Sequence, residues 1–126
     1  MAQKIELGKS GEALIAEYLG KKGYLIIDRN WRIKGGEIDL IASSPEGVIV
    51  FVEVKTRNGF EIPADKIVLS QQKLRIMKSA HAYIVRYNIM KEPRFDLITI
   101  FGEGPQMRIS HIESYFYPTL ISARSL

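Results

Sequence analysis

Hydrophobic and polar positions alternate most regularly over residues 48–57, which predicts a β-strand. One face of this strand carries only valine, at positions 48, 50, 52 and 54. The other face changes from apolar at Ile49 and Phe51 to charged at Glu53, Lys55 and Arg57. Because a strand with one wholly apolar face belongs in the middle of a sheet, these charged side chains are expected to project from a rigid, central strand.

Similar patterns predict helices and strands along the rest of the chain. Apolar residues at helical spacing cover residues 6–21 and about 70–87, and Ser70 is the expected N-cap of the second helix. Further strands are expected at 24–32, 37–42, 95–101 and 107–113, and turn signals at 35–36 and 44–47 separate 24–32, 37–42 and 48–57. The order α-β-β-β-α-β-β predicts an α/β domain in which helices flank a central mixed β-sheet.

Composition narrows the class of protein. The chain has 126 residues, 46% of them hydrophobic, and no repeat or linker divides it, so residues 1–126 are expected to form a single domain with 114–126 as a C-terminal tail. The absence of cysteine excludes disulfides, thiolate metal sites and thiol nucleophiles. The N-terminus lacks the apolar segment of a signal peptide and no run is long enough to span a membrane. We therefore expect a cytoplasmic protein without a membrane partner.

Charge is distributed unevenly between the two halves of the chain. The formal net charge is +4 and the sequence pI is about 9.4, which is compatible with a polyanionic partner. Residues 1–63 carry nine basic and nine acidic side chains, whereas residues 64–126 carry nine basic and five acidic ones. An acidic pocket and an anion-attracting surface can therefore coexist in this chain.

Carboxylates on three predicted elements can meet in one place. Antiparallel pairing through the turn at 45–47 brings Asp39 opposite the Glu53 end of the next strand. Glu12 lies at the margin of the apolar arc of the first helix and can face inward. Two adjacent carboxylates repel each other unless a hard divalent cation such as Mg²⁺ lies between them. Lys55, on the same strand face as Glu53, would reach an attacking water or a phosphoryl oxygen.

These residues resemble the active-site pattern of the PD-(D/E)XK nuclease superfamily. The chain as a whole is similar to the bacterial YraN-like family, itself similar to archaeal Holliday junction resolvases. Ile38 stands where the superfamily's name calls for proline, which leaves the Asp39 carboxylate in place. The blocks that carry the similarity lie between residue 8 and about residue 113: Gly11-Glu12, Gly36-Glu37-Ile38-Asp39-Leu40-Ile41, Phe51-Val52-Glu53-Val54-Lys55-Thr56-Arg57, Lys73 and Arg94-Phe95-Asp96.

The resemblance implies a restriction-endonuclease-like fold and a Mg²⁺-dependent DNA endonuclease, with Mn²⁺ as a substitute metal and no organic cofactor. Asp39 and Glu53 would hold the metal, with the Val54 carbonyl as a third ligand. Lys55 would orient or activate the water, and Glu12 would belong to the same acidic cluster. Branched or single-stranded DNA is the candidate substrate.

Several residues outside this cluster have a functional and a structural interpretation. Arg57 is either a phosphate contact or a solvated loop charge. Lys73 lies in the apolar arc of the second predicted helix, where it either reaches the acidic site or a phosphate, or lays its aliphatic stem along the core edge. Asp96 either hydrogen-bonds around the core or begins a strand. His81 and His111 are expected to be structural.

Two alternatives to the nuclease hypothesis use the same sequence features. A non-catalytic nucleic-acid-binding module would keep the fold and bind DNA through phosphate contacts in a salt-sensitive way. A protein-interaction domain would use the aromatic tail at residues 115–118, with a homodimer as the candidate assembly. The same tail could instead cover the core or stack bases.

Overall fold

The computed structural model describes residues 11–58 and 64–116. It contains a five-stranded sheet, a helix at each side of that sheet and two shorter helices. The elements are α1 (Gly11–Lys21), β1 (Leu25–Ile33), β2 (Gly36–Ser43), β3 (Ile49–Arg57), α2 (Ala64–Ile67), α3 (Ser70–Arg86), β4 (Arg94–Phe101), η1 (Gly104–Gln106) and β5 (Arg108–Ile112). The predicted order α-β-β-β-α-β-β is confirmed, with α2 and η1 as additions. The start of the first predicted helix, residues 6–10, and the loop at 59–63 lie outside the described residues.

The sheet is mixed, as the sequence predicts. Its strands lie in the order β1-β2-β3-β4-β5, and every pair is antiparallel except β3 and β4. Parallel neighbours need a long crossover connection, which α3 provides between β3 and β4. β3 and β4 are thus central strands, and β3 carries the charged face that the sequence indicated.

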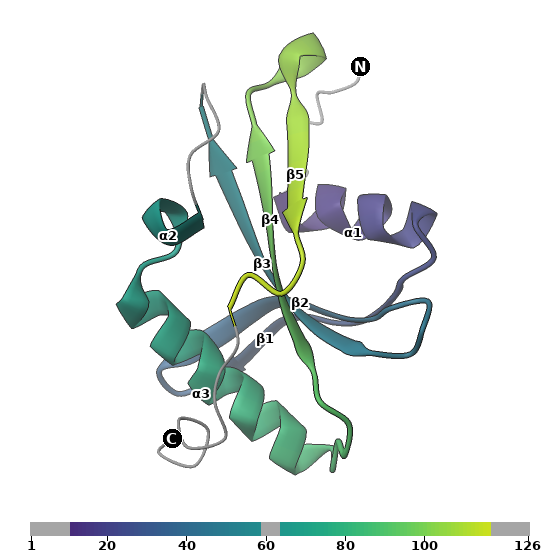
Figure 1. The fold of residues 1–126 in the computed structure, drawn as a ribbon, viewed down its shortest axis with the longest axis vertical. Helices are drawn as coiled ribbons and strands as arrows, with labels where there is room; N and C mark the ends of the chain where they lie inside the picture. Colours follow the sequence, from purple (N-terminus) through teal and green to yellow (C-terminus); the bar gives the residue numbers. More distant parts are fainter. Residues whose placement is uncertain (1–10, 59–63, 117–126) are drawn as a thin grey trace.

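Hydrophobic residues cover both faces of the sheet, one cluster packing with α1 and the other with α3. The two helices lie on different sides of the sheet (Figure 1). Val50 and Val52 pack with Ile15 and Leu19 of α1, whereas Phe51 packs with Ile76 of α3. The predicted alternation along β3 is therefore confirmed, and Glu53 and Lys55 continue the α3 face. Among the described residues, none of the helices has the length and apolar character needed to cross a membrane.

The sheet splits between β2 and β3. Their ladder runs from Ser43 opposite Ile49 to Leu40 opposite Val52 and ends there. β2 continues its pairing with β1 as far as Gly36, and β3 continues its pairing with β4 as far as Arg57. The β1–β2 hairpin consequently turns away from the upright β3, β4 and β5 (Figure 1). Asp39 is the first β2 residue beyond the last paired rung.

Helix α3 packs closely on the β1–β2 turn. A Cβ atom at Gly36 would clash with the Ser79 hydroxyl and lie 3.1 Å from the Arg75 carbonyl oxygen, so only glycine fits this approach without a shift. Ser70 was expected as the N-cap of this helix, but the structure places Leu69 there and Ser70 in the first turn. The side-chain oxygen of Gln72, at the third position of the helix, accepts the Leu69 N–H at 2.9 Å, so the N-cap backbone is bound although leucine itself offers no capping oxygen.

Candidate active site

Asp39 bridges the opening between β2 and β3. Its Oδ2 accepts a hydrogen bond of 2.8 Å from the backbone N–H of Val54. This contact takes the place of a ladder hydrogen bond where the two strands have separated. Because the N–H and C=O of one strand residue point to the same side, the Val54 carbonyl also faces the β2 side of the strand.

Glu53 and Lys55 form an ion pair on the α3 face of β3. Lys55 Nζ lies 3.1 Å from Glu53 Oε2, and the two side chains are 18% and 13% exposed. Charges so well shielded from water need a partner of opposite charge, and Glu53 and Lys55 are partners for each other. The pair is therefore more than the exposed surface ion pair that a short acid-x-lysine string usually indicates.

The proton affinities of Asp39 and Glu53 reflect their proximity. Burial, and then the negative charge of Glu53, raises the pKa of Asp39 to about 7, although the Val54 hydrogen bond acts in the opposite direction. Burial also raises the pKa of Glu53, against the opposing effect of Lys55. Glu12 and Glu37 raise both values further, so all four carboxylates belong to one electrostatic cluster.

A pocket of about 400 Å³ opens between this cluster and α3. Its lining combines acidic and basic side chains with two glycines and an apolar floor: Arg32, Gly35, Gly36, Glu37, Asp39, Glu53, Gln72, Arg75 and Ile76. Glu37 is also 3.5 Å from Arg32 in an ion pair. The pocket thus brings Asp39 and Glu53 together, as predicted, and adds Gln72 and Arg75, which the sequence did not indicate. Glu37, whose place at the start of a predicted strand favoured a solvated end residue over a further carboxylate of the site, lines the pocket as well.

Glu12 approaches the cluster from the N-terminus of α1. The helix begins against β3 and β4, since a Cβ atom at Gly11 would lie 3.5 Å from Val54 Cγ1 and 3.6 Å from Ile100 Cδ1. Glu12 is half-buried, and its charge acts on both Asp39 and Glu53. It is not among the residues that line the pocket, so its influence on the site is electrostatic in this structure.

Arg57 and Lys73, the two predicted DNA contacts, lie outside the described pocket lining. Arg57 Nη1 donates to the carbonyl oxygen of Thr56 at 2.7 Å. Lys73 Nζ lies 5.7 Å from the centre of the Phe116 ring, a cation–π geometry that matches the core-edge interpretation of this residue. Tyr115 and Phe116 pack against the α3-face core, whereas Tyr117 and Pro118 lie outside the described residues.

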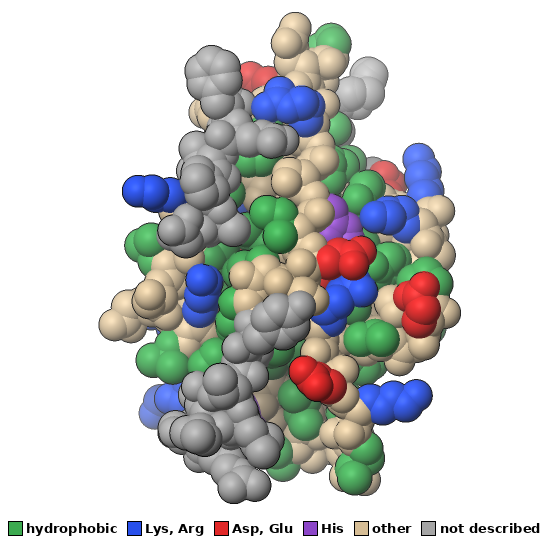
Figure 2. Space-filling view, in the orientation of Figure 1, with side chains coloured by type: hydrophobic (Ala, Val, Ile, Leu, Met, Phe, Trp, Pro, Cys, Tyr) green, Lys and Arg blue, Asp and Glu red, His purple; other side chains and the backbone are tan. Residues whose placement is uncertain are grey.

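Charged groups of both signs are interspersed on the face shown in Figure 2. Among the described side chains, Lys and Arg stand apart from one another on this face rather than forming one continuous surface. The net charge of +4 therefore does not translate into a broad basic patch on this side. The charged side chains that line the pocket are therefore the stronger candidates for ligand contacts.

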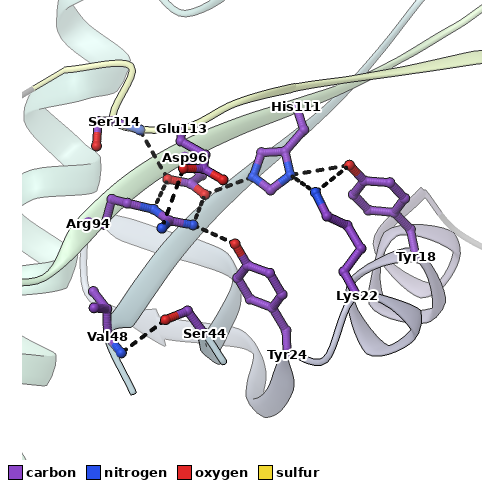
Figure 3. A network of polar contacts seen from close by, with 10 residues as sticks. All are labelled: Tyr18, Lys22, Tyr24, Ser44, Val48, Arg94, Asp96, His111, Glu113 and Ser114. Carbon is purple, nitrogen blue, oxygen red and sulfur yellow. Dashed lines mark hydrogen bonds and ion pairs between the residues drawn. The ribbon is translucent and has the colours of Figure 1, made fainter. Parts of the chain in front are cut away.

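Asp96 belongs to a polar network on the opposite, α1 face of β4 (Figure 3). Arg94 donates to both of its carboxylate oxygens, at 2.9 and 2.8 Å, and His111 Nε2 lies 2.8 Å from Oδ2. Burial alone would raise the pKa of Asp96, but the hydrogen bonds from His111, Arg94 and the Ser114 N–H outweigh it and lower the pKa. Asp96 is therefore a buried, charged acceptor of several hydrogen bonds, which supports the interpretation that it hydrogen-bonds around the core.

The same network ties α1 to the sheet. The other ring nitrogen of His111 lies 3.3 Å from the hydroxyl of Tyr18 and 3.5 Å from Lys22 Nζ, both on or next to α1. Arg94 also donates to the Tyr24 hydroxyl at 2.6 Å. His111, which was expected to be structural, thus links β4 and β5 to the helix that carries Glu12. Its spacing from Asp96 offers no sequence signal, because the two meet only through β4–β5 pairing.

The donor atoms at the sheet opening suit a hard divalent cation. Within residues 11–58 and 64–116, no group of three or more His, Asp or Glu side chains is placed to hold a metal ion. Mg²⁺ commonly needs only one or two protein carboxylates, because water and substrate phosphate complete its shell. Asp39 uses Oδ2 for Val54 and Glu53 places Oε2 near Lys55, which leaves Oδ1 and Oε1 as the atoms available to a cation. This all-oxygen set fits Mg²⁺ or Mn²⁺.

Comparison with known proteins identifies relatives over nearly the whole chain. The family model described as "Uncharacterised protein family UPF0102" matches residues 11–100. A UPF0102 protein of Bacteroides thetaiotaomicron is 43% identical over 95% of this chain and 99% of the relative. A UPF0102 protein of Flavobacterium psychrophilum is 37% identical over 93% of this chain and 98% of the relative.

The chain also has remote similarity to a solved structure. The protein titled "Crystal structure of SSO0001" is 16% identical and superposes with a TM-score of 0.42. The match covers 88% of this chain and 52% of that protein, so this chain spans about half the length of the solved one. A TM-score of this size adds nothing to the functional argument.

Proposed function

This chain belongs to family UPF0102, whose description names no activity, and from the geometry of its pocket we propose that it is a Mg²⁺-dependent DNA endonuclease. Membership of the PD-(D/E)XK superfamily, Mn²⁺ as an alternative metal and a cytoplasmic location are parts of the same proposal. DNA in branched or single-stranded form is the substrate class that the sequence resemblance favours.

One observation carries the proposal. Asp39 stands where the sheet opens, and Glu53, which is paired with Lys55, lines the same pocket from the adjacent strand. A structural ion pair would not need a second carboxylate, that of Asp39, whose pKa is raised to about 7 by burial and by Glu53. Perturbed proton affinities in a pocket are typical of functional sites.

Each residue has a distinct role in phosphodiester hydrolysis. Asp39 Oδ1, Glu53 Oε1 and the Val54 carbonyl are the proposed ligands of the cation, which when bound would neutralise the carboxylates and polarise the phosphate. Lys55 orients the water that adds to phosphorus and offsets charge on the phosphoryl oxygens. The bond from phosphorus to one sugar oxygen breaks, and the products are a phosphate monoester and a hydroxyl. Glu12 adds negative charge that strengthens cation binding.

The decisive experiment compares the parent protein with Lys55→Ala on a panel of branched, single-stranded and duplex DNA. Cleavage is expected with Mg²⁺ or Mn²⁺ for the parent and not for the variant, while both bind metal. Salt-sensitive DNA binding by the parent without any metal-dependent cleavage would instead favour the non-catalytic binding module. Equal cleavage by the parent and Lys55→Ala would reject the proposed site.

A further inference from the structure

The α3 wall of the pocket places two hydrogen-bond donors opposite the carboxylates. Gln72 and Arg75 are three residues apart and therefore lie on the same side of the helix, one turn above the other. Both line the pocket that Asp39 and Glu53 enter from the sheet, and the buried Ile76 beside them forms the apolar floor. A ligand in this pocket would touch a cation site on one side and neutral and cationic donors on the other.

Gln72 has a fixed orientation. Its Oε1 accepts the Leu69 N–H at 2.9 Å at the start of α3. The side-chain oxygen is thus used by the helix cap, and the Nε2 amide group is the part that remains to donate to a ligand. The side chain is half-buried, which limits the rotamers that would turn this donor away from the pocket.

Arg75 differs from the other arginine of the pocket. Arg32 lies 3.5 Å from Glu37 in an ion pair, whereas Arg75 has no ion pair within the described residues. The Arg75 backbone is held against the β1–β2 turn, because its carbonyl oxygen lies 3.1 Å from the position of a Cβ on Gly36. A guanidinium on a fixed backbone, beside a pocket and without a carboxylate partner, is suited to bind an oxyanion.

The charges that line the pocket favour a phosphate once a divalent cation is present. The lining carries three carboxylates and two guanidinium groups, so its formal charge is one negative unit when all are ionised. One divalent cation would make that charge one positive unit. A DNA phosphodiester carries one negative charge, so the occupied pocket attracts it and the metal-free pocket does not.

We propose that Arg75, assisted by the Gln72 amide, binds the DNA phosphate on the α3 side of the pocket, opposite Asp39 and Glu53. The backbone of the DNA strand would then cross the mouth of the pocket, over the edge that the β1–β2 turn and the first two turns of α3 form together. The proposal rests on the proposed function for the identity of the ligand as a nucleic-acid phosphodiester. In this proposal Arg75 and Gln72 contact the phosphate in the pocket, and Arg57 and Lys73 do not.

The test measures binding of a short fluorescein-labelled DNA strand by fluorescence anisotropy, with Ca²⁺ as the divalent cation in place of Mg²⁺. Arg75→Gln should weaken binding about tenfold and reduce the slope of log K against log salt by about one unit, as loss of one phosphate contact requires. Arg75→Lys should recover only part of the affinity, because it keeps the charge but not the planar donor group. The matched control is Arg86→Gln, which removes the same charge from the same helix about 16 Å further along its axis.

A separate Mn²⁺ titration of the protein alone should be unchanged in Arg75→Gln, and circular dichroism should show an intact fold. DNA affinity equal to the parent in Arg75→Gln, or an equal loss in Arg86→Gln, would overturn the proposal. Cleavage does not enter these readouts. A parent protein that binds DNA through Arg75 yet never cleaves would therefore reject only hydrolysis, whereas cleavage with unchanged Arg75→Gln binding would reject only the Arg75 assignment.

Discussion

Lys55 Nζ lies 3.1 Å from Glu53 Oε2, and the two side chains leave adjacent positions on one face of the central strand β3. Glu53, a proposed ligand of the metal ion, is thus paired with the positive charge of Lys55. A divalent metal on the other oxygen of Glu53 would leave Lys55 facing the substrate. The relationship gives separate predictions for catalysis and for metal binding.

Replacing Lys55 with alanine should reduce single-turnover DNA cleavage by about a hundredfold or more, because the lysine acts on charge that develops during the reaction. Mn²⁺ affinity should stay the same or increase, since Glu53 loses a competing positive partner. Single-turnover kinetics and isothermal titration calorimetry measure the two effects. Lys66→Ala on α2, an exposed lysine outside the pocket, is the control and should cleave like the parent.

Asp39→Asn and Glu53→Gln should each weaken Mn²⁺ binding at least tenfold, because each removes one of the two proposed carboxylate ligands. Electron paramagnetic resonance of free Mn²⁺ gives the binding isotherm directly. Glu46→Gln, in the exposed turn between β2 and β3, removes the same charge away from the site and should leave the isotherm unchanged. Unaltered binding in both ligand variants would exclude the proposed metal site.

The pH dependence of metal-free stability should reveal the carboxyl group of Asp39. Its pKa is raised to about 7, mainly by burial, so between about pH 4 and 7 the folded protein binds a proton there that the unfolded chain lacks. The protonated Asp39 therefore adds to the free energy of unfolding at low pH, and this stabilisation is lost as pH rises through about 7. Asp39→Asn keeps an acceptor for Val54 and should therefore be more stable than the parent at pH 8 by more than about 1 kcal/mol.

Chemical denaturation without divalent metal at pH 5 and pH 8 measures this difference. The difference in the free energy of unfolding between Asp39→Asn and the parent should be larger at pH 8, and it should become smaller when Mg²⁺ is added to the parent. A gap that is the same at both pH values would contradict the raised pKa.

Asp96→Asn should destabilise the protein by about 3–5 kcal/mol, because it leaves Arg94 without its buried carboxylate partner. Urea denaturation at pH 7 provides the value. Glu113→Gln is the matched control, since Glu113 lies 3.6 Å from the same arginine but is 55% exposed. Its expected loss is below about 1 kcal/mol.

Gly36→Ala should lower stability by about 1–3 kcal/mol, because the new methyl group meets the Ser79 hydroxyl and the Arg75 carbonyl oxygen. It should also weaken DNA binding if Arg75 is the phosphate contact, since α3 must move away from the β1–β2 turn. Gly20→Ala on α1, where nothing lies within 4 Å of a new Cβ, should be neutral or stabilising. Thermal unfolding compares the two variants.

Much of the site-bearing strand could be predicted from sequence, because period-two alternation defines faces without knowledge of the fold. The pattern put Phe51, Glu53 and Lys55 on one side of β3, and the structure agrees. The prediction that Asp39 comes near Glu53 is also confirmed, because both side chains line the same pocket. What the pattern could not provide is the end of the β2–β3 ladder at Leu40, because strand divergence depends on how the β1–β2 hairpin packs against α3.

The helix side of the pocket could not be predicted for a different reason. Arg75 has the spacing of a solvated helix position, and it is indeed exposed. Its place beside the carboxylates follows from the packing of α3 on Gly36, a long-range contact that helical periodicity does not encode. His111 was passed over in the same way, since its meeting with Asp96 depends on the pairing of β4 with β5.

The hydrogen bond from Val54 to Asp39 gives the site a built-in spectroscopic reporter. The amide proton of Val54 points at the carboxylate, so its chemical shift should follow the ionisation of Asp39 as pH passes through about 7. Cation binding at the other carboxylate oxygen should move the same resonance in the absence of substrate. A single backbone signal thus records whether this opening in the sheet holds a proton or a metal ion.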